Sequence, residues 1–329
     1  NYKKRFYPMI TDKGQNTVGA GQTEACQVWP MDVPTELYHT NWVAERTIEW
    51  LRSQGDEDDW FCWMSFPDPH HPWDIPVSEM SRLNWKDVPL PSLYSESDGE
   101  RRALLADKPK HWLGYYEGSL WTNLESPREF IPAELTSDQI REINAITHIE
   151  NELIDDACGR VLGWLDDRGW MSNTDVFFTT DHGELQGDFG LMFKGPYHVD
   201  ALMRLPFIWR PAGGTESVSV GTPVGHLDLA PTFCEIAGIE IPDYMEGQTL
   251  PVSDNSFQGR DYVLTEWDSE HGPIDMHLKS IYRSDGWLCT AYDKSTLYEG
   301  TEGELYNLKI DPEQRENLWS KETQIQREL

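Results

Sequence analysis

The sequence of 329 residues carries 57 acidic and 27 basic side chains, which gives a formal net charge of −30 at pH 7. This charge excludes a nucleic-acid-binding protein, because binding to a phosphate backbone requires a basic surface. Docking on an anionic membrane is disfavoured for the same reason. With 38% hydrophobic and 12% aromatic residues, the composition is that of a folded protein with one large core or two unequal ones. No uncharged apolar run is long enough to predict a membrane-spanning helix. The five cysteines form no CxxC pair, which argues against a zinc ribbon or a dense disulfide network. A single disulfide bond remains possible, and the cysteine pattern does not indicate the cellular compartment of the protein.

The first part of the chain is rich in Pro, Trp and Gly and has few long periodic segments. Residues 42–53 place apolar side chains at helical spacing and predict a helix. Residues 60–66 (WFCWMSF) form a short apolar run that predicts a buried strand, and residues 67–72 (PDPHHP) end it because proline cannot continue the pairing. The polar, Pro-rich segment 73–132 is too long for a simple connection and is interpreted as an insertion on the substrate side.

The clearest predicted helix runs from Thr136 to Gly169. Thr136 and Gln139 have the spacing of a capping box, and apolar residues then recur every three or four positions. Residues 175–180 (DVFFTT) and 205–209 (LPFIW) are predicted strands. The chain thus has a helix, a turn, a buried strand and then a cluster of polar residues, which is the order typical of an α/β fold. In such folds ligands bind beyond the carboxyl ends of the strands.

The C-terminal part changes to short strands and turns. A short helix is expected from Asp228, its candidate N-cap, to Gly238. The strands predicted after it are 262–266, 278–283, 287–292 and 304–308. A small antiparallel sheet that closes on a polar terminal helix, 311–329, is therefore expected. The domain boundary follows from this change, with a catalytic α/β domain at 1–250 and an α+β subdomain at 251–329.

A group of polar residues lies where the strand 175–180 ends. Asp181 and His182 are followed by Gly183, and a carboxylate and an imidazole side by side can reach one divalent ion where the backbone turns. Lys194 adds a cation and His198 a second imidazole further along the chain. The plainer alternative for the pair is an N-cap Asp beside a structural His.

The stretch 173–211 closely resembles the core signature of the sulfatase family of the alkaline phosphatase superfamily. That signature has a strand ending in Asp-His-Gly or Asp-Asn-Gly, a Gly-rich turn, Lys-Gly, and Arg-x-Pro before the next strand. Three further segments agree in the family's order: 65–72 (SFPDPHHP), 226–250 (HLDLAPTFCEIAGIEIPDYMEGQTL) and 304–318 (ELYNLKIDPEQRENL). The resemblance implies an α/β, alkaline-phosphatase-like sandwich, in which helices flank a central, mostly parallel sheet and a small antiparallel sheet with a terminal helix follows.

The resemblance also implies a chemistry. Sulfatases hydrolyse sulfate monoesters with a formylglycine made from Cys or Ser, while a divalent cation neutralises the nucleophile and the sulfate oxygens. On this reading Asp181 and His182 bind the metal, Lys194 contacts the sulfate, and His70 contacts the ester oxygen and can protonate the leaving group. His71 is the alternate to His70, because two adjacent histidines leave the motif ambiguous by one position. The plainer reading of His71 is a residue that packs the loop.

The remaining site expectations carry alternatives. His198 either contacts substrate or supports Lys194 and its loop, Glu184 is expected to be a solvated turn residue, and Arg204 a buried partner of an acid. Calcium is the expected metal, with magnesium, manganese or zinc as alternatives, since His182 replaces the Asn of many sulfatases and imidazole favours manganese or zinc. Histidine at this position also occurs in phosphonate monoester and phosphodiester hydrolases. Hydrolysis of a phosphonate or phosphate ester is therefore the alternative activity.

Two family features do not occur in the sequence. One is a first strand that ends in paired metal-binding acids, and the other is the nucleophile motif Cys/Ser-x-Pro-x-Arg. Both are expected upstream of residue 1, so the sequence is interpreted as the C-terminal portion of a sulfatase that is inactive by itself, the whole acting on a small-molecule or saccharide sulfate ester. A degenerate, non-catalytic sulfatase is the other interpretation. Asp268 and His271, in the loop 266–273, could line the substrate pocket, and a solvated loop is the plainer reading.

Overall fold

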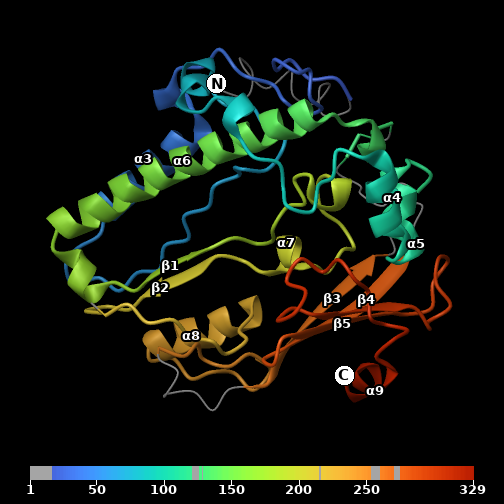
Figure 1. The fold of residues 1–329 in the computed structure, drawn as a ribbon. Helices are drawn as coiled ribbons and strands as arrows, with labels where there is room; N and C mark the ends of the chain where they lie inside the picture. The colour runs from blue at the N-terminus through green and yellow to red at the C-terminus, as the bar shows by residue number, and fades with distance from the viewer. Residues whose placement is uncertain (1–16, 121–125, 128, 215, 253–259, 270–274) are drawn as a thin grey trace. The chain divides into compact units, whose positions relative to one another are not determined.

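The computed structural model describes residues 17–120, 126–127, 129–214, 216–252, 260–269 and 275–329 (Figure 1). The chain forms two compact units. Unit 1 comprises the described residues up to Arg101 together with Gly114–Gly195 and Ala201–Gly214, and unit 2 comprises Arg102–Leu113, Pro196–Asp200 and the described residues from 216 on. This division differs from the boundary expected at residue 250, because the helix predicted from Asp228 to Gly238 belongs with the C-terminal sheet.

Two helices of unit 1 pack against each other along an apolar seam. Helix α3 (His39–Arg52) covers the predicted segment 42–53 except for Ser53, its C-cap, and helix α6 (Ser137–Asp167) confirms the longest predicted helix (Figure 1). The capping box is formed, since Thr136 Oγ1 accepts from Gln139 N at 3.2 Å and Gln139 Oε1 accepts from Thr136 N at 3.0 Å. The buried residues of the seam are Ala44, Ile48, Leu51, Ala157, Val161 and Leu165.

The sheet of unit 1 consists of one pair of strands in the part of the chain that the structure describes. Strands β1 (Val176–Thr179) and β2 (Phe207–Arg210) occur where strands were predicted, and they pair antiparallel. The expected parallel pairing is therefore not seen between these two strands. The polar segment between β1 and β2 reverses the direction of the chain, so that β2 runs back along β1. Residues 60–66 have no strand assignment, and their side chains alternate between half-buried and exposed.

The segment 73–132 folds more regularly than its composition suggests. Trp73 and Ile75 are fully buried in the main core of unit 1, together with Ile140 and Phe193. Helices α4 (Asp98–Ala106), α5 (Lys110–Tyr116) and α7 (Asp200–Met203) each contain residues of both units. The 3₁₀ turns within the described residues are Thr35–Leu37, Val77–Arg82, Trp85–Asp87, Pro132–Glu134, Trp170–Asn173, Asp188–Gly190 and His226–Asp228.

Unit 2 is built on the predicted antiparallel sheet, with strand order β3-β4-β5-β6. The strands are β3 (Tyr262–Ser269), β4 (Met276–Arg283), β5 (Trp287–Tyr292) and β6 (Gly303–Asn307). Helix α8 (Leu229–Ile236) begins after Asp228, but the Asp228 carboxylate accepts from the amides of Gly225 and Gln248 and does not cap the helix.

The predicted C-terminal helix is present but shorter than the expected 311–329. Only α9 (Thr323–Glu328) is helical, because Gln314 adopts a left-handed φ of 56° that interrupts a right-handed helix after Pro312. The five cysteines are all unbridged. None of the described helices combines the length and the apolar character needed to cross a bilayer.

Candidate active site

The Pro-rich loop that follows residues 60–66 presents His70 to Lys194. The Nδ1–H of His70 donates to the carbonyl of His71 at 2.5 Å, so that Nε2 is the acceptor nitrogen. This Nε2 lies 3.0 Å from the ammonium of Lys194, which is 124 residues away in sequence. The structure thus brings together the two residues that the sequence assigned to the sulfate and the ester oxygen.

Lys194 is held in place by the residue before it. Phe193 adopts a left-handed φ of 65°, which is unfavourable for a bulky side chain and persists only where packing fixes it. Its ring is 1% exposed and contacts His71 at a centroid distance of 4.7 Å and Trp73 at 6.0 Å. The loop that carries His70 therefore also supports the backbone that carries Lys194.

Glu184 is closer to the site than the sequence indicated. Its Oε2 lies 3.7 Å from Lys194 Nζ, and its side chain is 20% exposed. The expected solvated turn residue is instead a half-buried partner of the lysine. The sequence offered no signal for this role, since the contact depends on how the loop between Glu184 and Lys194 folds.

Two of the other candidate histidines are buried. His71 is 7% exposed and stacks on His70 with ring centroids 4.3 Å apart, as expected of a loop-packing residue. His198 belongs to unit 2, where it is 4% exposed and its Nδ1 lies 2.6 Å from Ser280 Oγ. Burial lowers the pKa of His198 to about 4, so the imidazole is neutral at pH 7. Substrate contact by either histidine stays a prediction.

Asp181 and His182 follow β1 at a turn that requires glycine. Gly183 N donates to Leu202 O at 2.9 Å, and a Cβ on Gly183 would lie 1.9 Å from the carbonyl oxygen of Ala201. No side chain fits there, so the close approach of two backbone segments fixes the turn. Asp181, whose side chain is 82% exposed, and His182, at 40%, consequently point away from the packed core.

The hydrogen bonds of this pair fit a metal site. His182 Nδ1–H donates to Gly183 O at 2.9 Å, which leaves Nε2 as the free ligand atom, 3.6 Å from Asp181 Oδ2. Burial acts to raise the pKa of Asp181, but the adjacent His182 and the hydrogen bonds from His182 N and Thr180 Oγ1 lower it below its usual value. An ionised carboxylate and an oriented imidazole are suitable ligands for one divalent ion.

Two remaining expectations concern exposed residues. Arg204 was expected to be buried, but it is exposed beside the end of α7. Asp268, 77% exposed on β3, pairs with Nδ1 of His277, whose Nε2 lies 2.7 Å from Asp275. Asp268 is therefore engaged at the solvated end of the β3–β4 hairpin. His271 lies outside the described residues.

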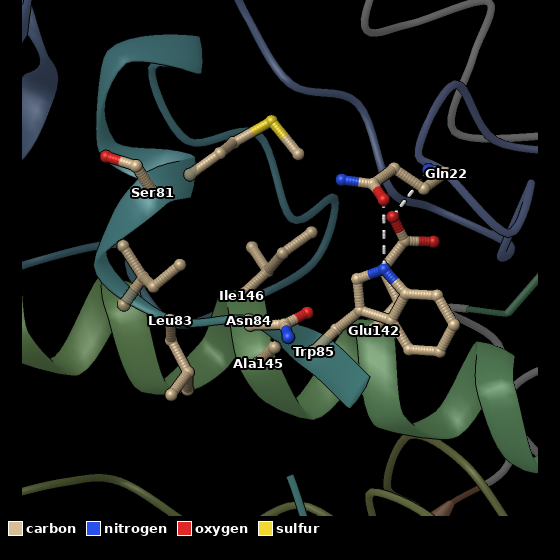
Figure 2. A pocket seen from close by; sticks show the side chains of 10 residues that line it. Gln22, Ser81, Leu83, Asn84, Trp85, Glu142, Ala145 and Ile146 are labelled. Carbon is tan, nitrogen blue, oxygen red and sulfur yellow. Dashed lines mark hydrogen bonds between the residues drawn. The ribbon is translucent and has the colours of Figure 1, made fainter. Parts of the chain in front are cut away.

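A pocket of about 200 Å³ in unit 1 is unrelated to these residues. Figure 2 shows it between α6 and the turns around Leu83 and Trp85. Its one acid, Glu142, accepts from the backbone amides of Gln22 at 2.5 Å and Thr23 at 2.8 Å. Trp85 Nε1 donates to Gln22 Oε1 at 3.1 Å. These hydrogen bonds anchor the turn at Gln22 and Thr23 to α6.

Known proteins show similarity over most of the chain. An arylsulfatase of Clostridium perfringens is 26% identical over 312 residues, which cover 90% of this chain and 57% of that protein. An N-acetylglucosamine-6-O-sulfatase of Bacteroides thetaiotaomicron is 28% identical over 179 residues, 51% of this chain and 30% of that protein. The crystal structure of the phosphonate monoester hydrolase of Agrobacterium radiobacter matches with a TM-score of 0.74 at 21% identity, over 91% of this chain and 60% of that one. The chain spans about half the length of the curated relatives it matches.

Two family models cover the chain between them. The C-terminal model of N-sulphoglucosamine sulphohydrolase matches residues 187–329. The Sulfatase model matches residues 2–239, which includes β1, the Asp181–His182 turn and the His70–Lys194 contact. The structural likeness supports the expected alkaline-phosphatase-like fold. With the sulfatase match over most of the sequence, these findings show that the chain belongs to the sulfatase family of hydrolases.

Proposed function

We propose that this chain is the C-terminal portion of a hydrolase that cleaves sulfate monoesters, with a small molecule or a saccharide as the leaving group. The observation that carries the proposal is the 3.0 Å contact between His70 Nε2 and Lys194 Nζ, which joins two separate family motifs. The names of the relatives, an arylsulfatase and an N-acetylglucosamine-6-O-sulfatase, support this substrate class.

His70 and Lys194 have complementary roles in this proposal. The Lys194 ammonium donates hydrogen bonds to the sulfate oxygens and stabilises their charge. The His70 Nδ1–H is fixed on a backbone carbonyl, so Nε2 is the atom that exchanges a proton. When substrate takes up the lysine, Nε2 can carry the proton that the departing ester oxygen requires, because an imidazole titrates near neutrality.

Asp181 and His182 are the proposed metal ligands of this chain. Both atoms that face outward, Asp181 Oδ2 and His182 Nε2, are available to one ion. A bound divalent cation, calcium or an ion such as manganese that tolerates imidazole better, supplies positive charge against the nucleophile and the sulfate oxygens.

The nucleophile is proposed to lie outside residues 1–329, as a formylglycine in a Cys/Ser-x-Pro-x-Arg motif. The apolar segment 60–66 supports this view. Phe61 is 63% exposed and Trp63 70% exposed, which is unusual for large aromatic side chains at alternate positions of an apolar segment. A further strand beside this segment would cover them. By this proposal residues 1–329 alone have no hydrolase activity, whereas a short enzyme with its own nucleophile would be active.

The alternative is a phosphonate monoester or phosphodiester hydrolase, favoured by the imidazole of His182 in place of an amide. The test compares kcat/KM for 4-nitrophenyl sulfate and for 4-nitrophenyl phenylphosphonate, using the full-length protein that contains this chain. A preference for the sulfate ester is expected, together with a loss of about 10²–10³-fold in Lys194→Met and no loss in the exposed control Lys86→Met.

Three results would decide against parts of the proposal. A preference for the phosphonate establishes the alternative, and no turnover of either ester by the intact protein establishes a degenerate sulfatase. Turnover of the sulfate ester by purified residues 1–329 with calcium or manganese, abolished by Asp181→Ala, contradicts an upstream nucleophile.

A further inference from the structure

A second group of potential metal ligands lies in the core of unit 1 and uses none of the residues of the proposed active site. One ligand atom each of His39, Asp68 and Asp74 lies within 4.8 Å of the others. Ligands on opposite sides of an ion at about 2.0–2.4 Å are separated by about this distance. His39 Nε2 and Asp68 Oδ1 are 2.5 Å apart, and Thr40 Oγ1 donates to Asp68 Oδ2 at 2.5 Å, which fixes that carboxylate.

A fourth acid points to a missing positive charge. Glu150, on α6, is 0% exposed, and its carboxylate has no positively charged side chain beside it among the described residues that shift its pKa, only the backbone of Asp74 as a donor. Asp68 and Asp74 are the charged neighbours that act on it. The hydroxyl of Tyr38, also 0% exposed and without a partner, is influenced by the same three acids. Leaving an isolated carboxylate in an apolar interior is costly, so such a group calls for a counter-charge.

The charges of this cluster do not balance. Three buried carboxyl groups share one imidazole, that of His39, which pairs with Asp68 and acts on Asp74. Burial raises the pKa of Asp74 to about 7, with His39 opposing the shift and Asp68 adding to it. An unpaired buried charge destabilises a protein by several kcal/mol, whereas a bound cation removes the penalty.

We propose that His39, Asp68 and Asp74 bind a divalent transition-metal ion, manganese or zinc, whose charge also balances the buried Glu150, at a structural site distinct from the Asp181–His182 pair. One imidazole nitrogen with several carboxylate oxygens is a ligand set that these two ions accept better than calcium or magnesium. The site joins the start of α3 and the middle of α6 to the loop that carries His70, because Asp68 and Asp74 stand on either side of that loop. The ion thereby fixes both ends of the loop.

The test uses the full chain with Asp181→Ala and His182→Ala, so that ions at the active-site ligands are not counted. The protein is incubated with manganese, zinc, calcium or magnesium, dialysed, and examined by elemental analysis and thermal melting. About one equivalent of manganese or zinc and a raised Tm are expected. Retention of no ion, or of calcium or magnesium alone, overturns the assignment.

Variants locate the ion. Glu150→Gln and His39→Gln are each expected to weaken binding at least tenfold in a calorimetric titration, and His148→Gln, exposed on the same helix as Glu150, to leave it unchanged. Equal binding in all three variants overturns the proposal. If a core variant fails to fold, cobalt is bound to the unmutated His39–Asp68–Asp74 site instead. The visible spectrum of the bound cobalt reports whether its ligands are imidazole and carboxylates or only water, and water ligands alone overturn the proposal.

Discussion

At the residue scale, backbone carbonyls decide which imidazole nitrogen is available for chemistry. In both His70 and His182 the Nδ1–H donates to the carbonyl of the next residue, at 2.5 Å and 2.9 Å. Both therefore present Nε2, one to Lys194 and the other to the proposed metal. The same local interaction thus prepares two histidines for different roles, and it leaves neither ring free to rotate without losing a hydrogen bond.

Gly183→Ala is expected to disrupt the Asp181–His182 turn. The new Cβ would lie 1.9 Å from Ala201 O, which the backbone must move to avoid. We expect a loss of about 2–3 kcal/mol in the free energy of unfolding, measured by urea denaturation. Gly159→Ala, in α6 with nothing within 4 Å, is the matched control and is expected to gain about 0.5–1 kcal/mol. Equal effects of the two substitutions would contradict the steric argument.

The candidate site residues that could be predicted from the sequence belong to contiguous motifs. Asp181, His182 and Lys194 lie within one short stretch, and His70 lies in a Pro-rich motif of its own. The tautomers, the left-handed Phe193 and the pairing of Glu184 could not be predicted, because they depend on backbone torsions and on contacts between distant segments. Nor could the cluster around Asp68, since its members come from three separate segments, α3, the loop at 68–74 and α6, and share no spacing.

At the element scale, strands β5 and β6 explain why the C-terminal motif begins with Glu304. Its carboxylate is 2% exposed and accepts from Tyr292 OH at 2.5 Å and Tyr306 OH at 2.6 Å. Burial raises the pKa of Glu304, and the nearby Lys108 opposes the shift. Lys108 is itself buried and donates to Tyr306 OH at 2.9 Å. The motif therefore encodes a buried ionic network that ties the sheet to residues 102–113.

Glu304→Ala is expected to destabilise unit 2 strongly. The substitution leaves Lys108 as an uncompensated buried charge and removes the acceptor of two tyrosine hydroxyls, at a cost of about 3–5 kcal/mol. The free energy of unfolding from urea titration, followed by tryptophan fluorescence, provides the measurement. Glu299→Ala, exposed in the turn before β6, is the control and is expected to change stability by less than about 0.5 kcal/mol. A loss below about 1 kcal/mol in Glu304→Ala would show that the network is not structural.

His198 is expected to make unit 2 sensitive to acid. Its pKa is about 4 in the folded protein and 6.5 when unperturbed, so below pH 6.5 the unfolded chain binds the proton first. Its contribution to stability is therefore complete above pH 6.5 and decreases as the pH falls toward 4, by about 2 kcal/mol between pH 7.5 and pH 5. The stability difference between wild type and His198→Asn should shrink by this amount.

Urea denaturation at both pH values measures this change, and the difference between the two proteins cancels the titration of the surface acids. The exposed His148, replaced by Asn, is the control and should give the same difference at both pH values. A pH-independent difference for His198→Asn would mean that the imidazole is not kept neutral by burial.

At the scale of the whole molecule, the order of family motifs predicted the fold, whereas the grouping of segments into two units was not predictable. Units form through contacts between distant segments, and the short stretches 102–113 and Pro196–Asp200 join unit 2 although their neighbours in sequence belong to unit 1. The net charge of −30 is a second property of the whole molecule that bears on the proposed site. Under the proposed function, an anionic sulfate ester requires local positive charge in an acidic protein, and Lys194 with the proposed metal would supply it.

The exposed aromatic residues of segment 60–66 test whether this chain is part of a longer domain. In residues 1–329, Phe61→Lys with Trp63→Lys should change the Tm little and reduce self-association, because both side chains already face solvent. In the full-length protein the same pair should lower the Tm markedly, since an upstream strand would bury them and two buried lysines are costly. Sedimentation and thermal melting measure both effects. Ile310→Lys, 83% exposed, is the control and should be neutral in both proteins. If the full-length protein tolerates the double substitution as well as the chain does, segment 60–66 is a true surface and the upstream strand does not pack there.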